Sequence, residues 1–332
     1  MLPEEAWSLV PDRPPPDMPP WIERFAGASK FSRREFLSYA WAMRLIEIAN
    51  VIALPGDRVG QPRYVDVSAG FIPIDATEEG PRTSPRAAQA QILKPRLRIG
   101  DIAYVFGVVA GVDRQWFASN TPVDIPSLSA GPDALPFPLI VEPRVVYLDS
   151  PPDPVGAKAS CFVTPQINKR FFGPTWNAGI VIARHSLQNL GFNLGAQVSM
   201  TNGQAYPVCD IDASTNIDAA IVDCGTLPAG TTSLPITPAL APGSTVHLHL
   251  NAGVTNGSVL RVHDHPHYYG NLIAHRVFTD THGQLHDSGS LVTDATTGHA
   301  AGTYIGHTNI PQEGFVQSFR QISKYFEVDL HI

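Results

Sequence analysis

Residues 282–294 read HGQLHDSGSLVTD, and a serine on a tight turn stands at the centre of this stretch. Ser288 lies between Asp287 and Gly289, and the apolar pair at 291–292 follows. Glycine permits sharp turns, and a short apolar run after a turn is typical of a strand. Two interpretations are open: a surface turn that enters a strand, or a nucleophilic serine held on a tight loop. The surrounding sequence has to separate them.

The composition favours a β-rich chain that does not bind nucleic acid. The 332 residues are 43% hydrophobic and only 16% charged, with 31 prolines and 27 glycines. Many turns and a sizeable core suit β architecture better than a helical bundle. The net charge is −7 and there is no dense Lys/Arg block, which argues against nucleic acid as a partner.

Neither a membrane span nor a secretory signal is predicted. No apolar run approaches the roughly 18 residues of a spanning helix. The proline-rich amino terminus lacks a basic segment followed by an apolar one, so the expected compartment is cytoplasmic. Cys161, Cys209 and Cys224 are too few for a disulfide framework, and buried thiols are favoured over a bridge between the last two.

The chain divides by composition and hydrophobic pattern into three parts. Residues 1–20 are rich in proline and are expected to form an extended or disordered leader. Residues 21–140 form an N-terminal α+β accessory domain. Its helix begins with Ser32 and Glu35 spaced as a capping box. Residues 141–332 form the second domain.

In the second domain, short apolar runs alternate with Gly, Pro, Asn and Ser turns, such as AGIVIARH, TVHLHL and GSLVTD. This spacing predicts a mainly β sandwich or barrel. Near the end, the spacing of Phe315, Phe319, Ile322 and Phe326 predicts an amphipathic helix over 313–326.

A serine becomes a nucleophile only when a base takes its proton and a third group orients that base. His185 ends the apolar run of NAGIVIARHSL and is the candidate base. Asp218 opens the run DAAIV and is the candidate orienting acid, with Asp210, Asp212 and Asp223 as nearby alternatives.

The three segments, in the order His, Asp, Ser, resemble the trypsin/chymotrypsin-like serine proteases. GIVIARHSL resembles the strand that runs into the catalytic histidine, and HDSGSLV resembles the segment around the nucleophile. Four further segments agree in order: GAKASCFVTP, DAAIV, NAGVTNGSVLRV and AAGTYIG. The resemblance covers roughly 145–330 and implies two six-stranded antiparallel β-barrels, preceded by the N-terminal α+β extension and followed by the C-terminal helix.

The resemblance also implies roles for individual residues. Ser288 would be the nucleophile of a serine endopeptidase, His185 the general base and Asp218 the orienting acid. The N–H groups of His286 and Ser288 would form the oxyanion hole. The implied substrate-binding residues are His282, near the specificity pocket, and Tyr304, Ile305 and Gly306, which would pair with the substrate backbone.

Two departures from the family pattern concern the loop before the serine. The family usually has glycine where this chain has His286, because the loop often needs a backbone conformation that is costly for other residues. No Ile-Val-Gly-Gly activation sequence precedes the domain, so Asp287 is expected to find a partner other than a new amino terminus.

Two alternatives remain open from the sequence. The first is a protease-like binding module with weak or no catalysis, which the unusual His286 favours. The second is a metal-binding β protein that uses the histidines at 247, 249, 263, 265 and 267, although no cysteine cluster supports it. The preferred hypothesis, a serine endopeptidase, needs no cofactor or metal. It takes a polypeptide as substrate, and a regulatory or recruiting protein could bind residues 21–140.

Overall fold

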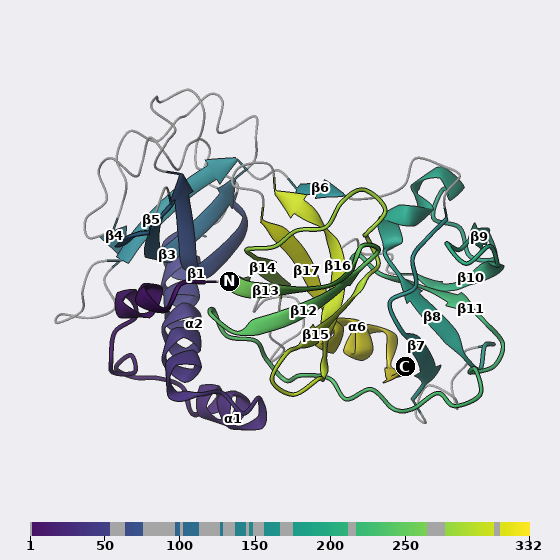
Figure 1. The fold of residues 1–332 in the computed structure, drawn as a ribbon, viewed down its shortest axis with the longest axis horizontal. Helices are drawn as coiled ribbons and strands as arrows, with labels where there is room; N and C mark the ends of the chain where they lie inside the picture. The colour runs from purple at the N-terminus through teal and green to yellow at the C-terminus, as the bar shows by residue number, and fades with distance from the viewer. Residues whose placement is uncertain are drawn as a thin grey trace.

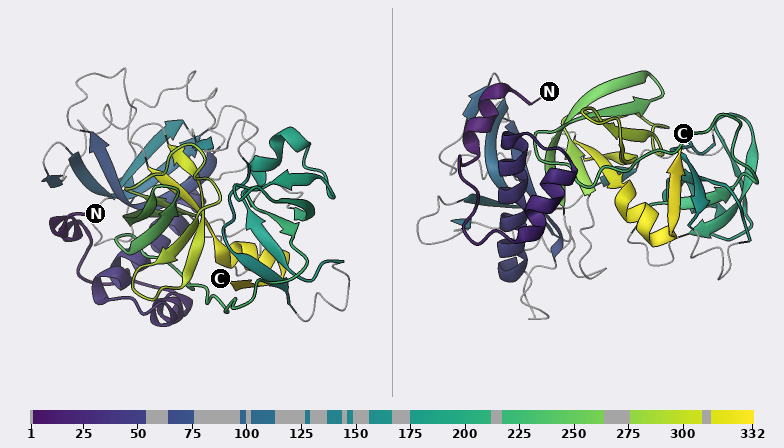
Figure 2. Two further views of the ribbon diagram at one scale, coloured as in Figure 1. Left: turned by 45° about the vertical axis from the view of Figure 1, so that its right-hand side comes forward. Right: turned by 90° about the horizontal axis from the view of Figure 1, so that it is seen from below.

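We describe the protein from a computed structural model. The described residues are 2–53, 64–75, 97–99, 102–112, 127–128, 137–143, 146–148, 156–166, 175–211, 217–263, 276–308 and 313–332. They form a mainly β molecule in which a closed barrel lies between an N-terminal sheet with its helices and a second six-stranded sheet (Figures 1 and 2). The predicted mainly β class is therefore confirmed.

The central barrel contains six antiparallel strands in the order β12-β15-β16-β17-β14-β13, and pairing of β12 with β13 closes it. The strands are β12 (Thr245–Leu250), β13 (Gly253–His263), β14 (Arg276–Thr279), β15 (Leu291–Asp294), β16 (Ala300–Thr308) and β17 (Gly314–Ser318). Alternation along β12 shows how the sequence specifies the barrel. Val246 and Leu248 are fully buried, whereas His247 and His249 share the more exposed face.

The second sheet also has six antiparallel strands, in the order β18-β7-β8-β11-β10-β9. They are β7 (Phe162–Pro165), β8 (Gly179–Ile182), β9 (Gln197–Ser199), β10 (Ala205–Ile211), β11 (Ala220–Asp223) and β18 (Val328–His331). The two outermost strands of this sheet, β18 and β9, do not pair with each other in the described part of the chain. Of the two predicted barrels, therefore, the central one closes as a ring and this one does not. A short 3-10 helix, η2 (Arg184–Leu190), follows β8.

The N-terminal part continues the barrel's sheet. Its strands are β1 (Tyr64–Asp75), β2 (Leu97–Ile99), β3 (Ile102–Val112), β4 (Ser127–Leu128) and β5 (Phe137–Pro143). β1 pairs with β13 of the barrel, and β6 (Val146–Leu148) pairs with β16. The predicted boundary near residue 140 stays a prediction, but the parts on either side of it share one sheet and one core.

The junction between β1 and β13 depends on close backbone approach and a buried ion pair. Gly70 has a φ of +146°, and a Cβ there would lie 2.3 Å from the Leu260 carbonyl oxygen. Arg261, 1% exposed, donates to both carboxylate oxygens of Glu313 at 2.6 and 2.7 Å and to the Ser68 hydroxyl at 3.1 Å. The N-terminal sheet is therefore held by packing and by a satisfied buried charge.

The helix predicted from the capping box is confirmed as α2 (Arg33–Ala53). The Ser32 N–H donates to the Glu35 carboxylate at 2.8 Å, and the Glu35 N–H donates to the Ser32 hydroxyl at 3.3 Å. The helix α1 (Pro20–Ala28) precedes α2 and packs beside it (Figure 1).

The leader, expected to be extended or disordered, is ordered over residues 2–20. It contains the 3-10 helix η1 (Glu4–Leu9). The Leu2 N–H donates to the Ser258 hydroxyl at 2.8 Å, and the ring of Trp7 stacks edge-on to Phe71 with 5.5 Å between centroids. Proline limits regular structure but does not prevent packing of the apolar side chains between the prolines, and here tertiary contacts order the segment.

The terminal helix is shorter than predicted. Helix α6 (Phe319–Phe326) begins after Ser318, whose hydroxyl accepts the Arg320 N–H at 3.2 Å. Phe315, assigned to the helix from its spacing, lies in β17, where both edges are paired. A strand buried on both faces has no periodicity of its own, so the helical spacing misplaced the boundary.

Candidate active site

The structure brings Ser288, His185 and Asp218 together between the barrel and the second sheet. The Ser288 Oγ lies 2.7 Å from the His185 Nε2, and the His185 Nδ1 lies 2.5 Å from the Asp218 Oδ2. Ser288 is 2% exposed and His185 is 7% exposed. With the Nδ1 proton donated to the carboxylate, the Nε2 lone pair is available to accept the serine proton.

Strand pairing explains why two distant residues meet. β8 and β11 are antiparallel neighbours, and Ile182 near the end of β8 faces Ala220 at the start of β11. His185 follows β8 in η2, and Asp218 precedes β11. Because the two strands are antiparallel, both residues lie at the same end of this strand pair. The serine comes from the barrel, on the loop that leads into β15.

Asp218 makes two hydrogen bonds to His185. Its Oδ1 accepts the His185 backbone N–H at 2.9 Å, in addition to the bond from Nδ1. Burial opposes ionisation of Asp218, but the hydrogen bonds and charge of His185, helped by Arg276, outweigh it and lower the carboxyl pKa below its ordinary value. The group is therefore held as a carboxylate that fixes both the position and the tautomer of the imidazole.

The alternative acids do not take this place. The Asp223 carboxylate accepts the Gly225 N–H at 2.8 Å instead, and Asp210 lies in β10, opposite Ile221 of β11. Asp212 lies outside the described residues.

The loop before the serine adopts the backbone conformation that normally favours glycine. His286 has a φ of +79°, and Gly289 has a φ of +94° with a would-be Cβ only 2.5 Å from the Lys158 carbonyl oxygen. Asn251 donates through Nδ2 to the His286 carbonyl at 2.9 Å and so fixes the following peptide. Within the described part of the chain, the N–H groups of His286 and Ser288 donate to no other group.

Asp287 is buried, at 3% exposed, and has the alternative partners that the sequence called for. Its carboxylate accepts the N–H of Asn251 at 2.6 Å and that of Gln284 at 2.8 Å. The Lys158 ammonium lies 3.7 Å from the same carboxylate and also donates to a backbone carbonyl. Burial lowers the pKa of Lys158, although Asp287 acts in the opposite direction. An internal lysine thus neutralises this aspartate.

Sequence reasoning missed Lys158 and Asn251 as functional residues. Both lie in segments that only supported the family resemblance, GAKAS and NAGVT, and no role was predicted for them. The available signal was Asp287, an acid for which a partner was expected, but the sequence did not indicate which lysine or arginine would supply the positive charge.

The candidate substrate-binding residues lie on β16 and on the loop before the serine. The Tyr304 hydroxyl accepts the Gly283 N–H at 2.9 Å, and its side chain is fully buried. Ile305 is 1% exposed and packs in a small apolar cluster. Both side chains support the loop and the core, so neither is free to contact a peptide, and the Tyr304 backbone already bonds to the nucleophile loop. His282 is half-buried, with its ring 5.3 Å from that of His307.

The histidine-rich metal hypothesis gains no support from the described residues. Across these ranges, no group of three or more His, Cys, Asp or Glu side chains is placed to hold a metal ion. His249 contacts the Thr293 hydroxyl at 3.2 Å, and the His263 Nδ1 donates to the Val67 carbonyl at 2.9 Å. The histidines at 265 and 267 lie outside the described residues. All three cysteines are free thiols; Cys161 is buried, whereas Cys209 and Cys224, predicted to be buried, are only partly buried.

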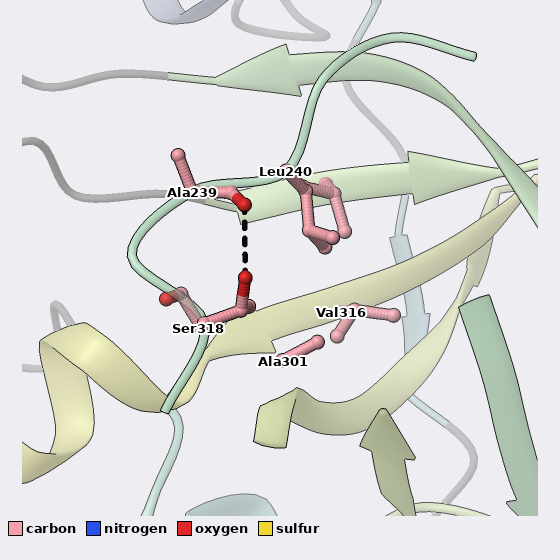
Figure 3. Close-up of a pocket in the computed structure, with 7 residues that line it drawn as sticks. Ala239, Leu240, Ala301, Val316 and Ser318 are labelled. Atoms are coloured by element: carbon pink, nitrogen blue, oxygen red, sulfur yellow. Dashed lines mark hydrogen bonds between the residues drawn. The ribbon is translucent and has the colours of Figure 1, made fainter. Parts of the chain in front are cut away.

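A small pocket inside the barrel is separate from this site (Figure 3). It is lined by Thr237, Ala239, Leu240, Val277, Ala301, Val316 and Ser318. The Thr237 hydroxyl is already bonded to the Ala239 carbonyl at 3.0 Å, and the other lining groups are mostly core side chains. The pocket belongs to the packed interior.

In the described part of the chain, no helix is long and apolar enough to cross a bilayer.

No family model and no curated protein matches the chain. Similar solved structures include Thermobifida fusca Protease A, 19% identical, covering 52% of this chain and 89% of that chain with a TM-score of 0.36. Nocardiopsis protease NAPase is 20% identical over 53% and 93% of the two chains, with a TM-score of 0.35. The MamO protease domain of Magnetospirillum magneticum is 21% identical over 50% and 96%, with a TM-score of 0.30.

Each of these three proteins is named as a protease or a protease domain, and each likeness covers about half of this chain. In this chain the fold rests on its own strand order: a closed six-stranded barrel beside a six-stranded antiparallel sheet.

Proposed function

We propose that this protein is a serine endopeptidase in which Ser288, His185 and Asp218 act as the catalytic triad. The observation that carries the proposal is the unbroken chain of hydrogen bonds from the serine hydroxyl through the imidazole to a buried carboxylate. A turn serine with no role in chemistry needs neither a base at 2.7 Å nor an acid behind that base.

The reaction follows from the geometry. The Ser288 Oγ attacks the scissile carbonyl carbon while its proton passes to the His185 Nε2. The C–N bond then breaks as Nε2 returns the proton to the leaving amine, which leaves an acyl-enzyme. Water, deprotonated by the same imidazole, then attacks the ester carbon. The bond from that carbon to Oγ breaks as Nε2 returns the proton to Oγ, which releases the new carboxyl terminus and restores the Ser288 hydroxyl.

The proposed oxyanion hole consists of the N–H groups of His286 and Ser288. Among the described residues neither N–H group has an acceptor, and Asn251 bonds to the intervening peptide; both observations support this role. Removing one such donor from an enzyme typically slows catalysis by about 10²–10³-fold, so the conformation of His286 is expected to affect the rate, although less than a triad member does.

Hydrolysis of an unfolded polypeptide tests the proposal. The wild-type chain should release new amino termini from reduced, carboxymethylated protein, and Ser288→Ala should abolish the release. Ser199→Ala is the matched control, because Ser199 is exposed in β9 and its loss should leave the rate unchanged. Equal rates for Ser288→Ala and the wild type would exclude Ser288 as the nucleophile.

A further inference from the structure

One edge of β16 carries both the nucleophile loop and β6. β17 covers the opposite edge over residues 302–307. On the shared edge, β15 pairs as far as Thr303. Next, Tyr304 donates its N–H to the Ser290 carbonyl and accepts the Gly289 N–H, both at 2.8 Å. Because a strand has only two edges, the loop that holds Ser288 lies on the same side of β16 as the strand that follows.

That strand is β6. It lies beside β16 (Figure 1). Its three residues pair antiparallel with β16, with Val146 facing Thr308 and Leu148 facing Gly306. β6 therefore runs toward Tyr304 and the nucleophile loop. At about 3.3 Å per residue, the step from Gly306 to Tyr304 along β16 is about 7 Å.

Gly306 belongs to the backbone that a peptide substrate would use. A peptide bound by strand addition needs the unpaired N–H and C=O groups of an edge strand. β6 already pairs with this part of β16, and it approaches the nucleophile loop with its carboxyl end leading. This is the direction of the acyl side of a substrate that pairs antiparallel with β16.

We propose that β6 is the chain's own occupant of the substrate-strand site, so that a peptide must displace it before cleavage. The proposal rests on the proposed peptidase function and specifies its regulation. β6 is close in sequence to β5, which the N-terminal sheet joins to the barrel through β1 and β13. Tethering keeps the local concentration of β6 high, whereas a three-residue ladder is weak enough to be displaced.

Tyr147→Pro tests the competition, because proline removes an N–H and disfavours strand pairing. Tyr147→Val is the matched control, since valine changes the side chain but keeps the backbone groups. In a Ser288→Ala background, which cannot cleave the probe, binding of a fluorescent extended decapeptide is measured by anisotropy. Tyr147→Pro should tighten binding about tenfold, the scale of one or two backbone hydrogen bonds, whereas Tyr147→Val should not. Unchanged binding by a folded Tyr147→Pro chain would overturn the proposal.

A reversible lock provides a second test that does not depend on tolerance of proline. Val146→Cys with Thr308→Cys places two cysteines at facing positions of the ladder. Facing residues of an antiparallel pair have Cα atoms about 4.5–5.5 Å apart, which is within the range of disulfides. With Ser288 present, the oxidised form should lose hydrolysis of extended peptides, regain it on reduction, and react throughout with a small fluorophosphonate.

The two readouts separate the hypotheses. Full peptide hydrolysis by the oxidised form would refute the role of β6 while leaving the peptidase intact. Failure of the reduced form and the wild type to react with fluorophosphonate would refute the peptidase itself, and the proposal about β6 with it.

Discussion

The substitution Asp218→Asn probes the orienting acid with little change in shape. Asp218 accepts two hydrogen bonds from His185, one from the backbone and one from Nδ1. An asparagine can satisfy the backbone donor with its carbonyl oxygen, but it then points its NH₂ group at Nδ1. The imidazole must accept that bond, so its proton moves to Nε2, which can no longer take a proton from Ser288.

We expect kcat to fall about 10⁴-fold, which corresponds to about 5 kcal/mol of transition-state stabilisation, with little change in KM. Steady-state hydrolysis of a chromogenic peptide measures both constants. Asp223→Asn is the control, because that carboxylate bonds to Gly225 and not to His185. A kcat for Asp218→Asn within tenfold of the wild type would refute the assignment of Asp218.

The same variant has a predictable effect on stability. The pKa of Asp218 is lowered in the folded protein, so its ionisation stabilises the fold above the unfolded-state pKa. This contribution disappears as the pH falls through the folded-state pKa. The difference in unfolding free energy between the wild type and Asp218→Asn should therefore be largest near neutral pH and shrink in acid. Denaturant titrations at several pH values measure it, and a difference that grows in acid would contradict the argument.

Substitutions at three further positions test the residues that hold the loop and the fold. His286→Gly should keep or raise both stability and kcat, because the left-handed backbone costs a non-glycine residue about 1–2 kcal/mol; His286→Val should lower both, and a fully active valine variant in peptide hydrolysis would contradict this. Lys158→Met should lower kcat at least several-fold by leaving the Asp287 carboxylate without its cation, and Lys158→Arg should restore part of the loss; equal activity of all three chains would show that the cation is dispensable. Glu313→Gln should destabilise the fold by about 3–5 kcal/mol in denaturant titrations because the Arg261 charge is left buried, and a loss below 1 kcal/mol would contradict that role.

The sequence was most informative where function depends on short local patterns. The turn around Ser288, the apolar run before His185 and the run after Asp218 each place a chemical group at a strand end, and the structure brings these three groups together. The histidine at 286, where the family pattern has glycine, left open whether this loop turns differently, and the structure gives His286 a left-handed φ of +79°.

Long-range pairings could not be read in the same way. Nothing in the local pattern of β1 indicates that it pairs with β13, because either edge of a sheet offers the same backbone groups. The order of the leader depends on how Trp7 packs against Phe71, a contact between segments that only the folded chain brings together. Lys158 was missed for the same reason, since its charge matters only through its place beside Asp287.

The most direct test of Ser288 as the nucleophile is to locate the reactive serine chemically. The wild-type chain is treated with a fluorophosphonate, digested and mapped by mass spectrometry, beside Ser288→Ala and His185→Ala. We predict a single adduct on Ser288 in the wild type, none in Ser288→Ala, and strongly slowed formation in His185→Ala, because the base at Nε2 is gone. An adduct on another residue, or formation that does not depend on His185, would contradict the account.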